Sequence, residues 1–539
     1  MITGQLFKNA LISGANNLQN HRAEVDALNV FPVPDGDTGS NMSQTCMAAV
    51  GELQVMPDDA PLCDVAKKAA GALLRGARGN SGVILSLIFR GVSKSFKGLA
   101  QTDGRGLAAA FDAGQAAAYK AVMKPTEGTI LTVVREAAAA AVQADEPDEQ
   151  KAACVLCDAA QATLAKTPEL LPVLKEAGVV DAGGQGLLYL LEGMRTVLCG
   201  GEMISSEAPG ANPGAPREPA RRYRCTVSVA LSPNASSAVQ ALRAFLETKA
   251  SGSRVTEKGL TLTLEAQVDA PDELLSAALS CGEITAAGID RQTAEQASAP
   301  EKPAPAAPAK PAPQRAEPEK EYGFVAVAAG AGLEQLFYDL GADRVVSGGQ
   351  TMNPSTDDIL NAVLATPARH VFVLPNNKNI IMAAEQCVRL ADRGVSVVAT
   401  RTVPQGVTAM LSFDETKSPE ENHLQMHKAA EGVHTAQVTF AARDSAMRGE
   451  RIRKGQMLGM EDGKVTLVGD DLLDTAYRVS RRLVKKYGGD ILTVYYGADA
   501  AAEQANALAE RLQARFPSAE VNVVDGGQPV YFFLVSVEA

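Results

Sequence analysis

Hydrophobic side chains in the first 203 residues recur three or four positions apart, on an alanine-rich background. This spacing predicts amphipathic helices, because residues three and four apart share one face of a helix. Short breaks that contain glycine or proline separate the runs, as in antiparallel helices packed around one core. The clearest runs are residues 48–53, 66–74, 106–123, 130–143, 149–166 and 186–199.

The pattern changes after the helical region. Apolar residues alternate with polar ones over 224–231 and 259–268, which predicts two strands, and helical spacing follows at 235–248 and 271–281. We therefore expect a small α/β domain over residues 223–296.

Short, continuous apolar runs alternate with helical patterns in the rest of the chain. The runs at 322–328, 344–347, 370–374 and 395–399 are typical of strands buried on both faces. They predict an α/β domain with a mainly parallel sheet at the C-terminal end.

Two proline-rich stretches interrupt these patterns and are interpreted as linkers, since they hold too few apolar residues to form a core. The predicted organisation is a helical domain at 1–203, a linker at 204–222, a middle domain at 223–296, a linker at 297–321 and a C-terminal domain at 322–539.

Composition narrows the range of partners. The 539 residues include 51 Lys and Arg against 63 Asp and Glu, a formal net charge of −12, and no basic block, which argues against nucleic acid. No apolar run reaches the roughly 18 residues of a membrane span, and no signal-peptide pattern opens the chain. Eight scattered cysteines favour a reducing, cytoplasmic compartment, and Cys154 and Cys157 are interpreted as two separate thiols.

The loop at 28–42 is the most informative segment for chemistry. It places Asp35 and Asp37 two residues apart around Gly36, which has no Cβ, so both carboxylates are able to converge on one hard cation such as Mg²⁺. Pro32 and Pro34 hold the entry to this loop extended.

The same loop leads directly into a predicted helix. Its small polar residues lie where free backbone N–H groups and the positive end of the helix dipole favour phosphate. The alternative is a capped helix start with two solvated aspartates. The candidate phosphate contacts are Thr38, Gly39, Ser40 and Asn41.

Three further loops of small residues precede predicted helices, at 75–82, 125–129 and 178–186. Each loop is either a phosphate cradle or an ordinary helix–helix turn, and together they make a nucleotide site if they share one end of the bundle. The candidates in them are Arg78, Asn80, Ser81, Gly82, Thr129 and Asp181. An EF-hand is excluded because Cys46 stands where its glutamate is needed, and no Walker A sequence occurs.

The helical region resembles the nucleotide-binding subunit of dihydroxyacetone kinases, and the whole chain resembles the ATP-binding subunit of bacterial fatty acid kinases. The motifs that carry the resemblance are residues 29–42, 76–86, 178–187, 348–356 and 374–380. This resemblance implies an all-α barrel of antiparallel helices that binds ATP and two Mg²⁺ ions, followed by a DegV-like C-terminal domain.

The implied activity is phosphorylation of a fatty acid carboxylate, presented by a separate DegV-type fatty-acid-binding protein, to give acyl phosphate for phospholipid synthesis. A cytoplasmic homodimer is also implied. By motif position Asp35 and Asp37 hold Mg²⁺, and Asn29 has a weaker metal role. The residues that the resemblance places against nucleotide are Thr38, Gly39, Ser40, Asn41, Asn80, Ser81 and Thr129. Arg78 is either a source of positive charge for the transition state or a solvated arginine at a helix end. A dihydroxyacetone or polyol kinase, and a nucleotide-binding scaffold without activity, remain the alternatives.

Two features of the rest of the chain bear on function. Members of the family often bind zinc in the middle domain through one cysteine and two histidines, but here Cys225 is followed by Glu265 and Gln267 at the histidine positions, so we expect no zinc. In the C-terminal domain, the loops 348–355, 375–379 and 402–406 follow predicted parallel strands, where α/β sheets bind ligands. These loops predict a docking surface for a partner or a small-ligand site.

Overall fold

The computed structural model describes residues 1–29, 36–122, 124–206, 222–231, 242, 250–258, 261–268, 271–279, 281–292, 315–349, 352–441, 445–447 and 450–538. The chain separates into two compact units, Met1–Pro209 together with Pro313–Ala539, and Gly210–Ala312. Most of both predicted linkers lies outside the described residues, so the five-part division of the chain stays a prediction.

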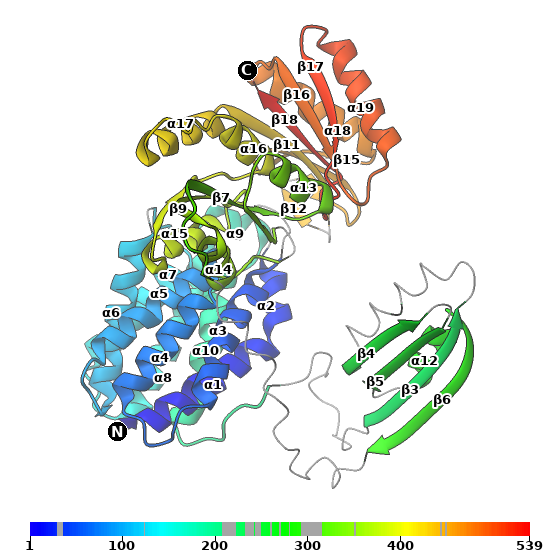
Figure 1. The fold of residues 1–539 in the computed structure, drawn as a ribbon. Helices are drawn as coiled ribbons and strands as arrows, with labels where there is room; N and C mark the ends of the chain where they lie inside the picture. The colour runs from blue at the N-terminus through cyan, green and yellow to red at the C-terminus, as the bar shows by residue number, and fades with distance from the viewer. Residues whose placement is uncertain are drawn as a thin grey trace. The chain divides into compact units, whose positions relative to one another are not determined.

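The N-terminal part of the first unit is mostly helical, as predicted (Figure 1). Its helices are α1 (Gly4–Asn20), α2 (Arg22–Leu28), α3 (Thr38–Gln54), α4 (Leu62–Arg75), α5 (Gly79–Ser95), α6 (Gly104–Ala121), α7 (Ile130–Ala144), α8 (Glu149–Leu170), α9 (Pro172–Ala177) and α10 (Ala182–Leu198). Two short strands, β1 (Ile2–Thr3) and β2 (Gln101–Thr102), pair antiparallel beside them.

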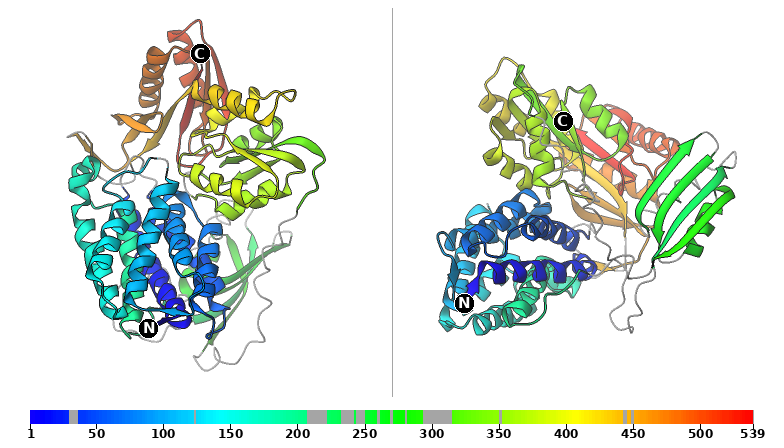
Figure 2. Two further views of the ribbon diagram at one scale, coloured as in Figure 1. Left: turned by 90° about the vertical axis from the view of Figure 1, so that its left-hand side faces the viewer. Right: turned by 60° about the horizontal axis from the view of Figure 1, so that its bottom comes forward.

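The long helices pack in a circuit. From α1 the contacts pass through α3, α4, α5, α6, α7, α8 and α10, and α10 packs against α1 again. Figure 2 shows the same helices side by side from two other directions. Three helices begin directly after an aspartate that caps them. The Asp103, Asp148 and Asp181 side chains accept hydrogen bonds from backbone N–H groups in the first turns of α6, α8 and α10.

The first sheet of the C-terminal region is parallel throughout, as the apolar runs predicted. Within the described residues its strand order is β10-β9-β7-β8. The strands are β7 (Lys320–Ala328), β8 (Arg344–Ser347), β9 (Ala368–Leu374) and β10 (Gly394–Val397), and the helices between them are α13 (Ala331–Asp339), α14 (Thr356–Ala365) and α15 (Ile381–Leu390).

The second sheet of this region departs from the prediction of a mainly parallel sheet, because most of its strand pairs are antiparallel. Its order among the described residues is β15-β14-β11-β18-β16-β17, and only β16 and β17 pair in parallel. The strands are β11 (Val433–Phe440), β14 (Met457–Glu461), β15 (Lys464–Gly469), β16 (Ile491–Tyr496), β17 (Glu520–Asp525) and β18 (Phe533–Glu538). The cause at β14–β15 is local: Asp462 and Gly463 both have positive φ, as a tight hairpin requires.

Among its described residues, the C-terminal region contains four more helices and a short antiparallel strand pair. Helices α16 (Val403–Leu411) and α17 (Pro419–Glu431) connect the two sheets, α18 (Leu472–Tyr487) and α19 (Ala502–Arg515) accompany the second sheet, and β12 (Ser445–Met447) pairs with β13 (Glu450–Ile452). None of the helices in the described part of the chain combines the length and the apolar character that crossing a membrane takes.

A shared hydrophobic core joins the helical region to the first sheet. Buried Ile359 and Val363 on α14 and Ala384 on α15 belong to the same cluster as the buried residues of the helical region. Helix α14 contacts α4, and α15 contacts α5. The first sheet is therefore packed against the helices, not merely tethered to them.

The second unit contains an antiparallel sheet, whose order among the described residues is β4-β5-β3-β6. Its elements are β3 (Arg222–Leu231), β4 (Ala250–Lys258), β5 (Thr261–Val268), α12 (Pro271–Leu279) and β6 (Gly282–Gln292). The strand predictions at 224–231 and 259–268 and the helix at 271–281 are confirmed within a few residues, and β4 and β6 were not predicted. The predicted helix at 235–248 lies outside the described residues apart from Leu242. The side chains of Glu265 and Gln267 also lie outside them, so the absence of zinc stays a prediction.

Candidate functional site

A cleft of about 270 Å³ opens in the helical region where α3, α5, α7 and α10 begin. The loops before these helices are the same small-residue loops that the sequence singled out. Each helix start directs the positive end of its dipole there, which favours an anionic ligand such as a phosphate chain, although carboxylates already accept from the N–H groups of Ser40 and Gly184. The condition set for a nucleotide site, that the loops share one end of the bundle, is therefore met.

About half of the predicted site residues line this cleft. They are Asn29, Thr38, Asn80, Ser81, Thr129 and Asp181. Lys124 also lines it and was not predicted, although its place one residue before the loop at 125–129 was a usable signal. It is the one basic side chain among the described lining residues, and its ammonium group would offset phosphate charge.

Other predicted residues serve packing or turn away from the cleft. A Cβ on Gly39 would overlap the Arg22 carbonyl oxygen, and one on Gly82 would overlap Thr45 Oγ1, so both glycines allow close helix contacts. Ser40 donates from its N–H to Asp26 Oδ1 (2.9 Å) and from its hydroxyl to Asp26 Oδ2 (2.7 Å). Sequence analysis missed Asp26, which fixes the first turn of α3 against α2.

We expect Gly39→Ala to destabilise the protein by about 1–3 kcal/mol, the typical cost of overpacking. The added methyl meets backbone atoms of Arg22, which yield only if α2 moves away from α3. Urea unfolding measures the change. Gly51→Ala is the matched control on the same helix, where nothing lies within 4 Å of the new Cβ, and it should stabilise by about 0.5–1 kcal/mol. Equal effects of the two substitutions would contradict the packing argument.

The predicted metal ligands are only partly described. Asp35 lies outside the described residues. Asp37 precedes α3, is partly buried and accepts a hydrogen bond from the amide of Asn353, and Asn29 ends α2 at the cleft. The described residues hold no group of three His, Cys, Asp or Glu side chains suited to a metal. This donor set nevertheless fits Mg²⁺, which proteins usually hold through one or two carboxylates together with water and substrate phosphates.

A buried polar atom without a partner is a second sign that the cleft accepts a ligand. The Asn80 Oδ1 atom is buried and has no hydrogen-bond partner among the described residues. A buried amide oxygen left without a partner costs free energy, and such atoms in native proteins usually meet a ligand, an ion or water. The Thr129 hydroxyl, in contrast, donates to the Thr126 carbonyl oxygen (2.8 Å).

Arg78 and Asn41 were predicted for the nucleotide site, but both contact the C-terminal region. The Arg78 guanidinium donates to the Asn353 carbonyl oxygen (2.6 Å) and approaches Asp358 (3.4 Å). Asn41 is buried beside the amide of Asn353. Arg78, Asn41 and Asp37 are not among the residues that line the cleft, and all three contact Asn353 of the C-terminal region instead.

Asp181 combines helix capping with an altered acidity. Its carboxylate accepts from the Gly184 N–H (2.7 Å) at the start of α10. Burial raises the pKa of Asp181 to about 6 and outweighs the hydrogen bonds from the Gly184 and Ile130 backbones, which lower it.

This pKa predicts a pH dependence of stability. The unfolded chain releases the Asp181 proton near the ordinary value of 3.8 and the folded protein near 6, so the folded state binds more protons between these values. Stability should therefore fall as pH rises from about 4 to 6, by at most about 3 kcal/mol at 1.4 kcal/mol per pH unit. Unfolding of Asp181→Asn, which keeps a good N-cap, should lack this fall.

A control for Asp181→Asn exists at the start of α8. There the pKa of Asp148 is lowered, mainly by the hydrogen bond from the Lys151 N–H. Asp148 therefore adds stability above about pH 4, where Asp181 loses it, and Asp148→Asn should remove that stability. A wild-type protein whose stability relative to Asp181→Asn does not change between pH 4 and 6 would contradict the role of Asp181.

Two predicted features of the remaining sequence are also located. Cys154 and Cys157 are both free thiols, as predicted, and the Cys154 sulfur lies 4.0 Å from that of Cys199. In the C-terminal region, the three loops that were expected to share one sheet edge meet at a small pocket of about 50 Å³, which includes Gly348, Asn376 and Thr402.

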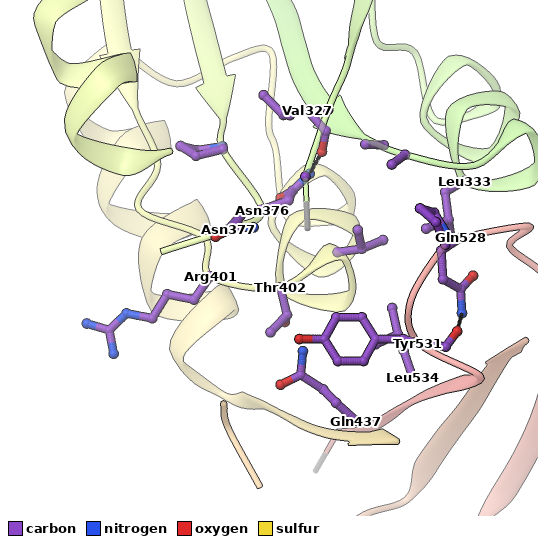
Figure 3. A pocket seen from close by; sticks show the side chains of 17 residues that line it. Val327, Leu333, Asn376, Asn377, Arg401, Thr402, Gln437, Gln528, Tyr531 and Leu534 are labelled. Atoms are coloured by element: carbon purple, nitrogen blue, oxygen red, sulfur yellow. Dashed lines mark hydrogen bonds between the residues drawn. The ribbon is translucent and has the colours of Figure 1, made fainter. Parts of the chain in front are cut away.

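Figure 3 shows this pocket, with Thr402, Gln437 and Tyr531 close together and Arg401 pointing away from them. The amide oxygens of Gln437 and Gln528 are buried without hydrogen-bond partners among the described residues. Asn376 does not point into the pocket as a free donor: its amide donates to the Val327 carbonyl oxygen (3.0 Å) and accepts from the Thr400 hydroxyl (2.8 Å).

Comparisons with known proteins match one family model to the helical region and another to the C-terminal region. Residues 32–196 match the DAK2 domain, and residues 323–538 match the FakA-like C-terminal domain of fatty acid kinases. Protein YloV of Bacillus subtilis is 38% identical over 562 residues, covering 100% of this chain and 99% of that protein. The chain belongs to the FakA-like family of fatty acid kinase proteins. The resemblance found in the sequence motifs is thereby confirmed.

The chain is also similar to one further relative and, more distantly, to two solved structures. An uncharacterized protein of Staphylococcus haemolyticus is 35% identical and covers 100% of this chain and 99% of its own length. A solved fatty-acid-binding DegV family protein of Thermus thermophilus has a TM-score of 0.31 at 14% identity, covering 41% of this chain and 100% of that one. The Fak B3 protein of Streptococcus pneumoniae, loaded with linoleic acid, has a TM-score of 0.30 at 12% identity, with 40% and 99% covered.

Proposed function

We propose that this chain is the ATP-binding subunit of a fatty acid kinase. It transfers the terminal phosphoryl group of ATP to the carboxylate of a fatty acid, which a separate DegV-type lipid-binding protein presents, and yields acyl phosphate for phospholipid synthesis. The observation that carries the proposal is the cleft at the starts of α3, α5, α7 and α10, in a chain of the FakA-like family.

Nucleotide binding rests on charge and backbone geometry. The helix starts and Lys124 favour the phosphates, while Thr38, Asn80, Ser81 and Thr129 supply polar side chains around them. Asp37, Asp35 and Asn29 would hold Mg²⁺, with two ions as the family resemblance implies. Bound Mg²⁺ supplies neutralisation of phosphate charge, which together with positioning is most of the catalysis in phosphoryl transfer.

A fatty acid carboxylate suits such a cleft as the acceptor. A carboxylic acid with an ordinary pKa of about 4–5 is already ionised at pH 7, so its oxygen attacks without a general base. Among the described residues that line the cleft there is no histidine. The chemistry asked of the protein is therefore to hold phosphate, metal and acceptor in line and to exclude water.

The second candidate function is phosphorylation of dihydroxyacetone or another small polyol, which the DAK2 domain match favours. An alcohol acceptor is not ionised at pH 7 and gains from a base or a metal near its oxygen. A scaffold that binds nucleotide without turnover is the remaining outcome.

Acceptor dependence of ADP release tests these functions. With Mg·ATP, we expect release that depends on oleate loaded on a DegV-type carrier, and none above background with dihydroxyacetone. Release with dihydroxyacetone alone would favour the polyol kinase, and tight ATP binding without release in a single turnover would favour the scaffold. Either result would contradict the proposal.

The roles of the other two regions are proposed as well. The C-terminal region would dock the lipid-binding partner near the pocket at Thr402, where Arg401 is exposed at the rim. The protein would act as a homodimer, and the middle unit would hold no structural zinc. Metal analysis of the purified protein tests the last point, since one zinc per chain would contradict it.

A further inference from the structure

Asn353 belongs to the C-terminal region, but its side chain contacts Asp37 in the helical region. We propose that Asn353 is a positioning residue for Asp37, so that the C-terminal region completes the metal site of the kinase. This inference rests on the proposed function, because Asp37 acts as a metal ligand only there.

The contact between these two residues is direct. Asn353 Nδ2 donates to Asp37 Oδ2 over 2.6 Å and lies 3.4 Å from Asn41 Oδ1. Asn353 is 1% exposed and Asp37 is partly buried, so little water reaches this hydrogen bond. A hydrogen bond to a carboxylate is stronger than a neutral one, and here it holds one carboxylate oxygen in a set direction.

The backbone around Asn353 is fixed from both sides. Arg78 donates to the Asn353 carbonyl oxygen (2.6 Å), and Arg78 and Ser355 form an isolated antiparallel bridge. The Thr356 N–H donates to the Ala77 carbonyl oxygen (3.1 Å). These bonds place the amide of Asn353 with little freedom, independently of its bond to Asp37.

The helical region is shaped to admit this side chain. Gly79 has φ +57°, and a Cβ built on it would lie 2.6 Å from Asn41 Nδ2 and 3.5 Å from Asn353 Nδ2. A Cβ at this position would therefore overlap the Asn41 amide, which lies beside Asn353, and would only touch the Asn353 amide. The Asn353 Oδ1 atom is buried without a hydrogen-bond partner among the described residues, so the amide is held by its donor side, which faces Asp37.

The physical consequence concerns the carboxylate. An aspartate bound to a metal through one oxygen is usually held by a hydrogen bond to the other, and loss of such an outer partner typically weakens metal binding or activity about 10–100-fold. Asp37 makes no side-chain cap to α3, so Asn353 supplies an orientation that the start of the helix does not.

Binding of Mn²⁺ to the full-length protein tests this role, measured from the electron paramagnetic resonance signal of free Mn²⁺. We expect Asn353→Ala and Asn353→Leu each to weaken Mn²⁺ binding about 10–100-fold. In turnover assays, the Mg²⁺ concentration for half-maximal rate should rise by a similar factor, while kcat at saturating Mg²⁺ returns toward the wild-type value. A merely structural role of Asn353 would not produce this split.

Asp357→Asn is the matched control. It removes a charge on α14 that faces Arg75 across the same boundary (4.0 Å) without touching Asp37, and Mn²⁺ affinity should not change. Leucine has nearly the shape of asparagine but no donor, so wild-type affinity in Asn353→Leu would overturn the inference, as would an equal loss in the control. If the wild-type protein binds no Mn²⁺, the proposed function fails too, whereas unchanged affinity in both Asn353 variants removes the inference alone.

Discussion

Asp37→Ala is expected to lower the rate of phosphoryl transfer by more than about 100-fold, because loss of a mere outer partner of a metal ligand already costs about 10–100-fold. Asp37 directly precedes Thr38, the first residue of α3, which lines the cleft in the helical region. Without it, the phosphates of ATP lose part of the metal that neutralises them in the transition state. Steady-state ADP release at saturating ATP measures the effect.

Asp112→Ala is the control for this prediction. Asp112 is exposed on α6 and bonds the side chain of Gln115, so its loss should leave the rate unchanged. A rate in Asp37→Ala within threefold of wild type would show that Asp37 does not hold the catalytic metal.

The second large effect is on stability, at Asn376 in the C-terminal region. Asn376 is 6% exposed, and its side chain bonds the Val327 carbonyl and the Thr400 hydroxyl. It also has φ +55°, a conformation that costs alanine about 1–2 kcal/mol. The two buried partners left unpaired cost about 1–3 kcal/mol each, so with the backbone cost Asn376→Ala should destabilise the protein by about 3–8 kcal/mol. Urea unfolding followed by circular dichroism measures this loss.

The neighbouring Asn377 offers a comparison for Asn376. Its side-chain oxygen accepts from the Asn379 N–H (2.9 Å), a local bond within the loop, so Asn377→Ala should cost about 1 kcal/mol. Equal losses at the two positions would contradict the structural role of Asn376. Because Asn376 supports the fold, substitution of exposed Arg401 is the cleaner test of partner docking at these loops.

The spacing of hydrophobic residues predicted much of the fold. It predicted the helical region and the parallel strands, since period and length of an apolar run directly reflect which face is buried. The antiparallel second sheet was missed because strand direction depends on connections: the turn at Asp462 and Gly463 returns the chain at once, while the apolar runs look alike in either sheet.

The candidate site was also predictable only in part. Small residues before helix starts predicted the cleft, because helix starts favour anions wherever they meet. The pairing of Ser40 with Asp26 was not predictable from the motif, since a serine hydroxyl bonds whichever acceptor packing brings near. The contact of Asn353 with Asp37 spans 316 positions and depends on how the C-terminal region packs on α4 and α5, which no local pattern encodes.

The most direct measurement is trapping of the product with hydroxylamine, which converts an acyl phosphate to a stable hydroxamate. The wild-type chain, Mg·ATP and oleate on a DegV-type carrier should yield oleoyl hydroxamate in an amount that follows ADP release. ADP release of the same size without any hydroxamate would show that the phosphoryl group goes elsewhere, and would contradict the assignment as a fatty acid kinase.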